Sequence, residues 1–165
     1  MPASSLERPW VGAGAFALGG LVGAAAFAVP GSPLYQAELI WKAYQALAVP
    51  FFALWAWDRL VRRPPPFVLA LDAAVVLAAG ARAFALIPFV SGHALFLAYA
   101  LATTREGVQA ALTLGLLVTV IFKLVGFHDV LTLAVGMTIG AVLGGWGRRL
   151  RGALKGRLPG TSSPR

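Results

Sequence analysis

The sequence predicts an all-α fold: a polytopic integral membrane protein with six transmembrane helices in one bundle and both termini in the cytoplasm. Of its 165 residues, 59% are hydrophobic and only 12% are charged, and the mean hydropathy is +0.78. Soluble domains carry about 25% charged residues, so the composition excludes an ordinary soluble protein. The chain contains no cysteine, which excludes disulfides and thiolate metal ligands.

Six apolar segments approach the roughly 20 residues that a helix needs to cross the hydrocarbon core of a bilayer. They cover about residues 9–29, 34–57, 66–82, 84–104, 106–125 and 129–147. Together they form one transmembrane domain over 1–147, followed by a basic cytoplasmic tail over 148–165 that we expect to be flexible. The sequence "GARAFALIPFVSG" leaves the boundary between the third and fourth spans open, because a helix there ends near Arg82 or runs on to Ile87.

The first span has a second interpretation, as a signal peptide cleaved after "AFA" at 26–28. Its apolar stretch of about 20 residues exceeds the 7–15 residues of a typical signal-peptide core. We therefore expect an uncleaved span.

The basic residues predict the orientation, because cytoplasmic loops are enriched in Lys and Arg. Eleven of the fourteen fall on one side of the six spans: Arg8, Arg59, Arg62, Arg63, Arg105, Arg148, Arg149, Arg151, Lys155, Arg157 and Arg165. That side is expected to be cytoplasmic, with the basic tail against anionic lipid headgroups. The net charge of +8 is then explained without nucleic acid.

A second set of ionisable residues lies near the opposite, outer ends of the spans: Glu38, Lys42, Arg82, His93, Lys123, His128 and Asp129. Ionisable groups at membrane depth usually face the bundle interior or a water-filled cavity, so these residues predict one polar pocket. Simpler interpretations remain open. Glu38 and Lys42 are spaced for an ion pair beside an aromatic belt of Tyr35, Trp41 and Tyr44, and Arg82 and Lys123 are long enough to reach headgroups.

Charged residues near the inner side have structural interpretations. Asp72, in the inner half of the third span, is expected to hydrogen-bond between helices, and the cluster from Asp58 to Arg63 to form a solvated connection. "RRPPPF" at 62–67 predicts a stiff turn between helices.

Small residues recur every four positions in the last span, at Thr132, Gly136, Gly140 and Gly144, and again at Gly19 and Gly23. Such stripes let helices approach closely. They predict interfaces within the bundle or with another copy of the chain, so a homo-oligomer through glycine-rich helices stays open.

The triplet Ser91-Gly92-His93 stands where the fourth helix is expected to begin. Serine is a good N-cap, and a helix start favours an anion such as phosphate. A histidine in the first turn is placed to donate a proton to a leaving group.

Together with "FKLVGFHDVLTLAVGMTIGAVLGG" at 122–145, this triplet resembles the type 2 phosphatidic acid phosphatase family over about residues 88–145. Members typically have six membrane helices and use two histidines, as nucleophile and as general acid. The resemblance implies His93 as the general acid, His128 as the nucleophile and Asp129 as its orienting partner. It implies phosphate binding by Ser91, Gly92 and Lys123, with Arg82 and Lys42 as spatial substitutes for the family's first motif.

This chain departs from the family pattern at four places. Val90 replaces the proline before the serine, Lys123 replaces an arginine, and His128 and Asp129 are adjacent rather than three residues apart. Adjacent helical residues do not face each other. The sequence "RRP" at 62–64 looks like the end of the first motif, but it falls on the predicted cytoplasmic side.

The expected function is binding, with hydrolysis as an open extension, of a lipid phosphate monoester or pyrophosphate at the outer face of a bacterial inner membrane. No cofactor is expected, and the expected partners are membrane lipids. Two alternatives stay open: a non-catalytic accessory subunit or small transporter, and a protein that binds haem through His93 and His128.

Overall fold

The computed structural model describes residues 9–28, 39–83 and 86–157, and every regular element in these ranges is a helix. The helices are α1 (Pro9–Ala28), α2 (Leu39–Arg62), α3 (Pro66–Ala83), α4 (Gly92–Thr103), α5 (Glu106–Ile121) and α6 (Val130–Arg157), with a π-helical turn at Phe122–Gly126 after α5. The predicted all-α class and the six helices are therefore confirmed.

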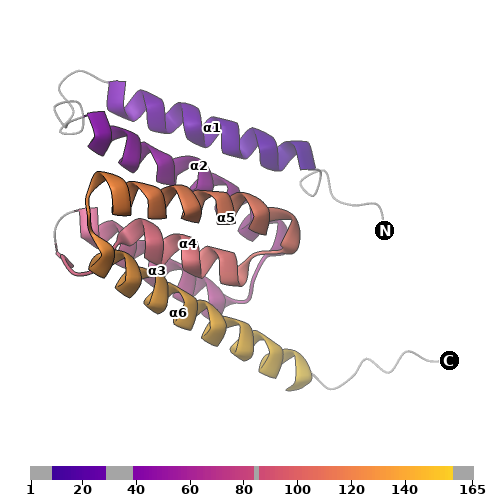
Figure 1. The fold of residues 1–165 in the computed structure, drawn as a ribbon. Coiled ribbons are helices and arrows are strands. Elements are labelled where there is room, and N and C mark those ends of the chain that lie inside the picture. The colour runs from indigo at the N-terminus through magenta and orange to yellow at the C-terminus, as the bar shows by residue number, and fades with distance from the viewer. Residues whose placement is uncertain (1–8, 29–38, 84–85, 158–165) are drawn as a thin grey trace.

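The six helices lie side by side in one bundle, with α1 at one edge and α6 at the other (Figure 1). Helix α1 begins and α6 ends at the same end of this bundle, which we call the terminal end; the opposite end is the far end. Glu38 lies outside the described residues.

Helix α4 is the centre of the fold, because nearly every residue from Gly92 to Thr103 is buried. Its 12 residues rise only about 18 Å, so α4 is shorter than the predicted span over 84–104. Pro88 lacks an N–H group and disfavours helical geometry at Ile87, and Ser91 caps the helix that follows. The described residues 86–91 are accordingly non-helical.

The glycine stripe of α6 packs directly against α4. A Cβ atom on Gly136 would lie 2.6 Å from the carbonyl oxygen of Ser91, and one on Gly140 would meet the carbonyl oxygen of Leu95. On α1, a Cβ at Gly19 would lie 2.8 Å from the backbone of Pro50. Of the two interpretations of these stripes, the structure therefore shows the one within the bundle.

The turn between α2 and α3 follows the predicted proline signal. Helix α2 ends at Arg62, Arg63 takes a left-handed φ of 42°, and α3 begins at Pro66. Proline suits a first helical turn, where its missing N–H group would be unpaired in any case. At the other end of the chain, α6 continues to Arg157, so the first part of the predicted flexible tail is helical.

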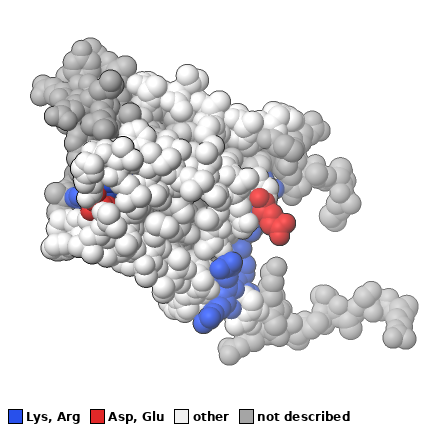
Figure 2. Space-filling model, viewed as in Figure 1, with Lys and Arg blue, Asp and Glu red and all other residues white. Residues whose placement is uncertain are grey.

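Two stretches are long and apolar enough to cross a membrane by length and composition: Glu106–Gly126 and Val130–Ala153. Only 28% of the residues in the most apolar window of each are buried inside the bundle. Charged side chains on the face in Figure 2 gather at the two ends of the bundle, and the surface between them is uncharged.

Candidate functional site

Six polar side chains from four parts of the fold meet near the far end, and we call them the polar cluster: Tyr44, Ser91, His93, Lys123, Asp129 and Thr132. Tyr44 comes from α2, Ser91 and His93 from the start of α4, and Lys123 from the π-helical turn. Asp129 and Thr132 come from the start of α6. Five apolar residues of α4, from Ala94 to Ala98, follow the cluster into the core.

Ser91 is the N-cap of α4, as predicted. Its hydroxyl accepts a hydrogen bond from the Ala94 N–H at 3.4 Å, and its own N–H donates to the Thr132 carbonyl at 2.9 Å. The Tyr44 hydroxyl shares a further hydrogen bond with the Ser91 hydroxyl at 3.2 Å. Ser91 thus joins α2, α4 and α6 while it caps the helix.

His93 is the member of the polar cluster that also borders an apolar cavity. Its imidazole stacks on the Tyr44 ring with centroids 4.2 Å apart. Its Nε2 atom is buried without a hydrogen-bond partner among the described residues. The same side chain lines a cavity of about 270 Å³ between α2, α3 and α4, whose walls are otherwise formed mainly by apolar residues such as Val49, Phe52 and Val76.

Lys123 points into the bundle from a widened turn of helix. In the π-helical turn the Phe127 N–H donates to the Phe122 carbonyl, and the Asp129 N–H donates to the Lys123 carbonyl at 2.9 Å. The Lys123 ammonium then donates to Asp129 at 2.6 Å and to the Thr132 hydroxyl at 3.2 Å. Its side chain is only 5% exposed, so the ion pair compensates a cation that is largely shielded from solvent.

Asp129 is held in its charged form by these partners. Partial burial alone would raise its pKa, but the hydrogen bonds from Lys123 and Thr132 outweigh burial and keep the pKa of Asp129 below its ordinary value. One carboxylate oxygen also accepts the Thr132 N–H at 3.2 Å. Asp129 therefore anchors the start of α6 and neutralises Lys123.

His128, which precedes Asp129 in the chain, contacts the backbone of the π-helical turn rather than a side chain of the polar cluster. It is exposed, takes a left-handed φ of 49°, and its Nδ1 lies 3.0 Å from the Leu124 carbonyl oxygen. Asp129, its expected orienting partner, bonds to Lys123 and Thr132. The structure thus brings His93, Lys123 and Asp129 into one region and gives His128 a separate environment.

The remaining predicted phosphate-binding residues have different surroundings. Gly92 packs against α3, where a Cβ atom would lie 2.5 Å from the Ala79 carbonyl oxygen. Arg82 is half-buried in the last turn of α3 and acts electrostatically on Tyr44. Lys42 belongs to α2, but its side chain lies outside the described part of the structure.

Sequence reasoning missed the roles of Tyr44 and Thr132. An aromatic belt was the one role considered for Tyr44, yet its side chain is buried, with 3% exposed. Its partner Ser91 is 47 residues away, and no local pattern links the two. The spacing of Thr132 three residues after Asp129 was a usable signal, because a capping side chain bonds the N–H group two or three positions later.

Asp58 and Arg59 belong to a largely buried network rather than to the expected solvated connection, whereas Arg63 is exposed as expected. The members of this network, the charge network, are Asp58, Arg59, Arg62, Asp72 and Arg105. Asp58 is fully buried and Arg59 is 6% exposed. Asp72 pairs with Arg59 at 3.0 Å and accepts a hydrogen bond from the Tyr99 hydroxyl at 2.6 Å, which confirms its predicted role between helices.

In the part of the chain that the structure describes, no group of three or more His, Asp or Glu side chains is placed to hold a metal ion. The haem alternative rests on His93 and His128, whose surroundings differ as described above. No family model, curated protein or solved structure matches this chain.

Proposed function

We propose that the chain is a six-span membrane protein whose far end binds a lipid phosphate at the outer membrane face. Membrane insertion is supported by the uncharged surface between two charged ends (Figure 2) and by exposed large apolar side chains along the bundle, such as Leu18, Leu77 and Leu117. Apolar surface on this scale needs a covering of lipid or protein. The orientation follows from the basic residues at the terminal end.

The observation that carries the proposal is that His93 belongs to the polar cluster and also lines the apolar cavity. A lipid phosphate has two parts that match these surroundings: a charged headgroup for the polar cluster and a hydrocarbon chain for the apolar cavity. In this arrangement the hydrocarbon enters the cavity beside Val49 and Phe52, and the phosphate meets Lys123 and Arg82. An ammonium has three N–H donors, and Asp129 and Thr132 engage two of those of Lys123.

The arrangement favours binding over hydrolysis. Phosphoryl transfer through a histidine needs a nucleophile placed to attack the phosphorus and an acid placed to protonate the leaving-group oxygen. His93 is placed beside the cavity, whereas His128 is exposed and Asp129 is engaged with Lys123. The resemblance to lipid phosphatases supports the ligand class, and the proposal is a phosphate-binding relative of that scaffold.

The test is the affinity of the purified protein in nanodiscs for phosphatidic acid compared with diacylglycerol, which has the same hydrocarbon and no phosphate. We expect Lys123→Gln/Asp129→Asn, which removes both charges of the pair together, to weaken phosphatidic acid binding about tenfold or more through loss of a charged hydrogen bond. Arg149→Gln, exposed at the terminal end, is the matched control. Equal binding of both lipids by the wild type would refute the proposal.

Release of inorganic phosphate from the same lipid separates binding from catalysis. We expect none above the rate without protein. Release by the wild type that is lost in His93→Ala would show instead that the site hydrolyses its ligand.

A further inference from the structure

A second hollow lies near the terminal end and shares no lining residue with the His93 cavity. It is a groove of about 640 Å³ between α1, α2 and α5, with walls formed by Phe16, Leu54, Trp57, Val108, Ala111 and Leu114. Arg105, which immediately precedes α5, is the one charged residue in its lining. The groove is thus a long apolar surface with a single cation.

The arginine at this groove belongs to a network with an excess of positive charge. Asp58 pairs with Arg105 at 3.1 Å, with Arg62 at 2.9 Å and, more distantly, with Arg59 at 3.6 Å. Arg59 also pairs with Asp72. Three arginines therefore share two aspartates, and the more exposed of the three are Arg62 and Arg105, at 27% and 32%.

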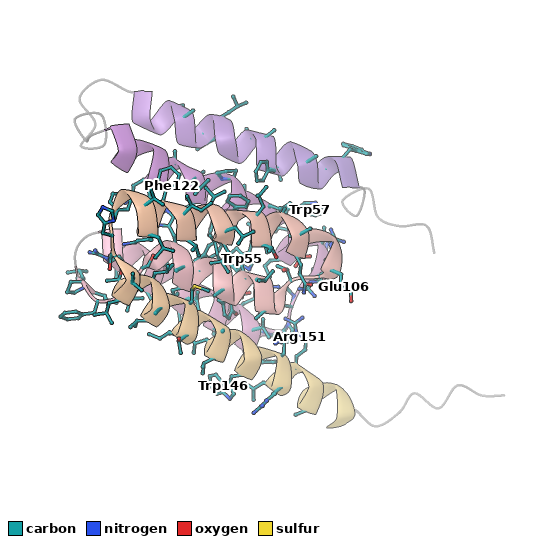
Figure 3. All side chains as sticks on the ribbon, in the orientation of Figure 1. Trp55, Trp57, Glu106, Phe122, Trp146 and Arg151 are labelled. Atoms are coloured by element: carbon teal, nitrogen blue, oxygen red, sulfur yellow. The ribbon has the colours of Figure 1, made fainter. Side chains whose placement is uncertain are left out.

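The neighbouring acidic residue does not cancel this charge at the groove. Glu106 lines a different hollow, together with Arg148 of α6 and Gln109. The Arg105 guanidinium instead lies 4.4 Å from the centre of the Trp57 ring, and Figure 3 shows Trp57 and Glu106 near the same end of the bundle. The contact with the Trp57 ring and the ion pair between Nε and Asp58 hold the guanidinium in place. Its planar fork suits the oxygens of a phosphate.

We propose that this groove binds one anionic phospholipid, with an acyl chain along Phe16, Leu54 and Leu114 and the phosphate on Arg105. An acyl chain matches the apolar walls, and the headgroup neutralises the excess cation of the charge network. A free phosphate lacks the hydrocarbon that would fill the groove. This inference rests on the membrane location proposed above, but it does not depend on the polar cluster at the far end.

Two glycines allow the groove to be tested by substitution, one at the groove and one as a control away from it. Gly107 lines it, and a Cβ atom there would have no neighbour within 4 Å. Gly107→Phe therefore adds a bulky ring at the wall of the groove, with no clash at its Cβ and no charge removed from the network. Gly145 on α6 is equally open and lines neither this groove nor the His93 cavity, so Gly145→Phe is the matched control.

The experiment counts lipids retained by the protein in native mass spectrometry after release from nanodiscs of phosphatidylglycerol and phosphatidylcholine in equal amounts. We expect the wild type and Gly145→Phe to retain phosphatidylglycerol preferentially, and Gly107→Phe to lose that preference. Arg105→Gln should reduce it about tenfold or more, as expected for a lost charged hydrogen bond. Equal retention of both lipids by the wild type, or wild-type preference in Gly107→Phe, would overturn the inference.

A further variant keeps the two proposed sites separable. Lys123→Gln alters the far end only, so it should leave phosphatidylglycerol retention at the wild-type level. Loss of that retention in Lys123→Gln with wild-type retention in Gly107→Phe would assign the bound lipid to the polar cluster and overturn the groove.

Discussion

At the scale of single residues, the Lys123–Asp129 pair controls how the far end responds to pH. The folded state holds the pKa of Asp129 below its ordinary value. The pair therefore stabilises the protein fully above roughly pH 4, the ordinary carboxyl pKa, and that contribution is lost as pH falls through the lower folded pKa.

We predict that the melting temperature of the wild type falls more steeply than that of Asp129→Asn as pH decreases below about 4. The variant lacks the titrating carboxylate and should be less stable than the wild type at neutral pH. Thermal melts in detergent from pH 7 to pH 3 measure both slopes. Glu106→Gln, which replaces an exposed carboxylate, should follow the wild type; parallel curves for the wild type and Asp129→Asn would contradict the role given to the pair.

Asp72 is the nearer ion-pair partner of Arg59 in the charge network, at 3.0 Å against 3.6 Å for Asp58. Removing one partner of a buried ion pair leaves an uncompensated charge and typically costs about 3–5 kcal/mol, whereas losing one hydrogen bond to a charged group costs about 1.5–3 kcal/mol. We therefore predict that Asp72→Asn lowers the free energy of unfolding, measured by SDS titration in mixed micelles, more than Tyr99→Phe does. The double variant Arg59→Gln/Asp72→Asn should recover part of the loss. A double variant that loses the sum of both single losses would show that the two residues are not coupled.

At the scale of elements, the packing of α6 on α4 depends on glycine at defined positions. A Cβ atom at Gly140 would overlap the Leu95 carbonyl oxygen, whereas one at Gly145 would meet nothing within 4 Å. We predict that Gly140→Ala lowers the free energy of unfolding by about 1–3 kcal/mol through overpacking. Gly145→Ala should be neutral or stabilising by up to about 1 kcal/mol, because alanine is the better helix former. The same titration checks both, and equal effects would place the α4–α6 interface elsewhere.

The elements themselves follow from local signals in the sequence. Apolar segments of helical length, the proline turn at 64–66 and the Ser91 cap each act within a few residues, so they could be read before the structure was known. The fourth span is the exception: it was placed over 84–104, whereas the helix capped by Ser91 begins only at Gly92.

The candidate site could be predicted only in part, because its bonds join distant positions. His93, Lys123 and Asp129 were found as ionisable residues near one side of the predicted bundle. Which of them pair depends on the π-helical turn that turns Lys123 inward and on α2 bringing Tyr44 to Ser91. The burial of Asp58 could not be predicted either, because its partner Arg105 belongs to another helix–helix connection.

At the scale of the whole molecule, the polar cluster and the charge network lie toward opposite ends of one bundle, separated by the buried apolar length of α4. If the bundle spans a bilayer, the two ends face different compartments, and the proposed orientation has the terminal end in the cytoplasm. The absence of cysteine allows this to be tested with single introduced thiols, because the parent protein carries no competing thiol.

We predict that His128→Cys, at the exposed far end, reacts with a membrane-impermeant maleimide added to intact cells, or to spheroplasts where an outer membrane is present. Glu106→Cys, exposed at the terminal end, should react only after the membrane is permeabilised. The unmodified chain is the blank. Reaction of both thiols in intact cells would place both ends on one side and rule out a spanning bundle, whereas reaction of Glu106→Cys alone would invert the orientation. Inversion would move the polar cluster to the cytoplasmic face, where its lipid phosphate would have to be drawn from the inner leaflet.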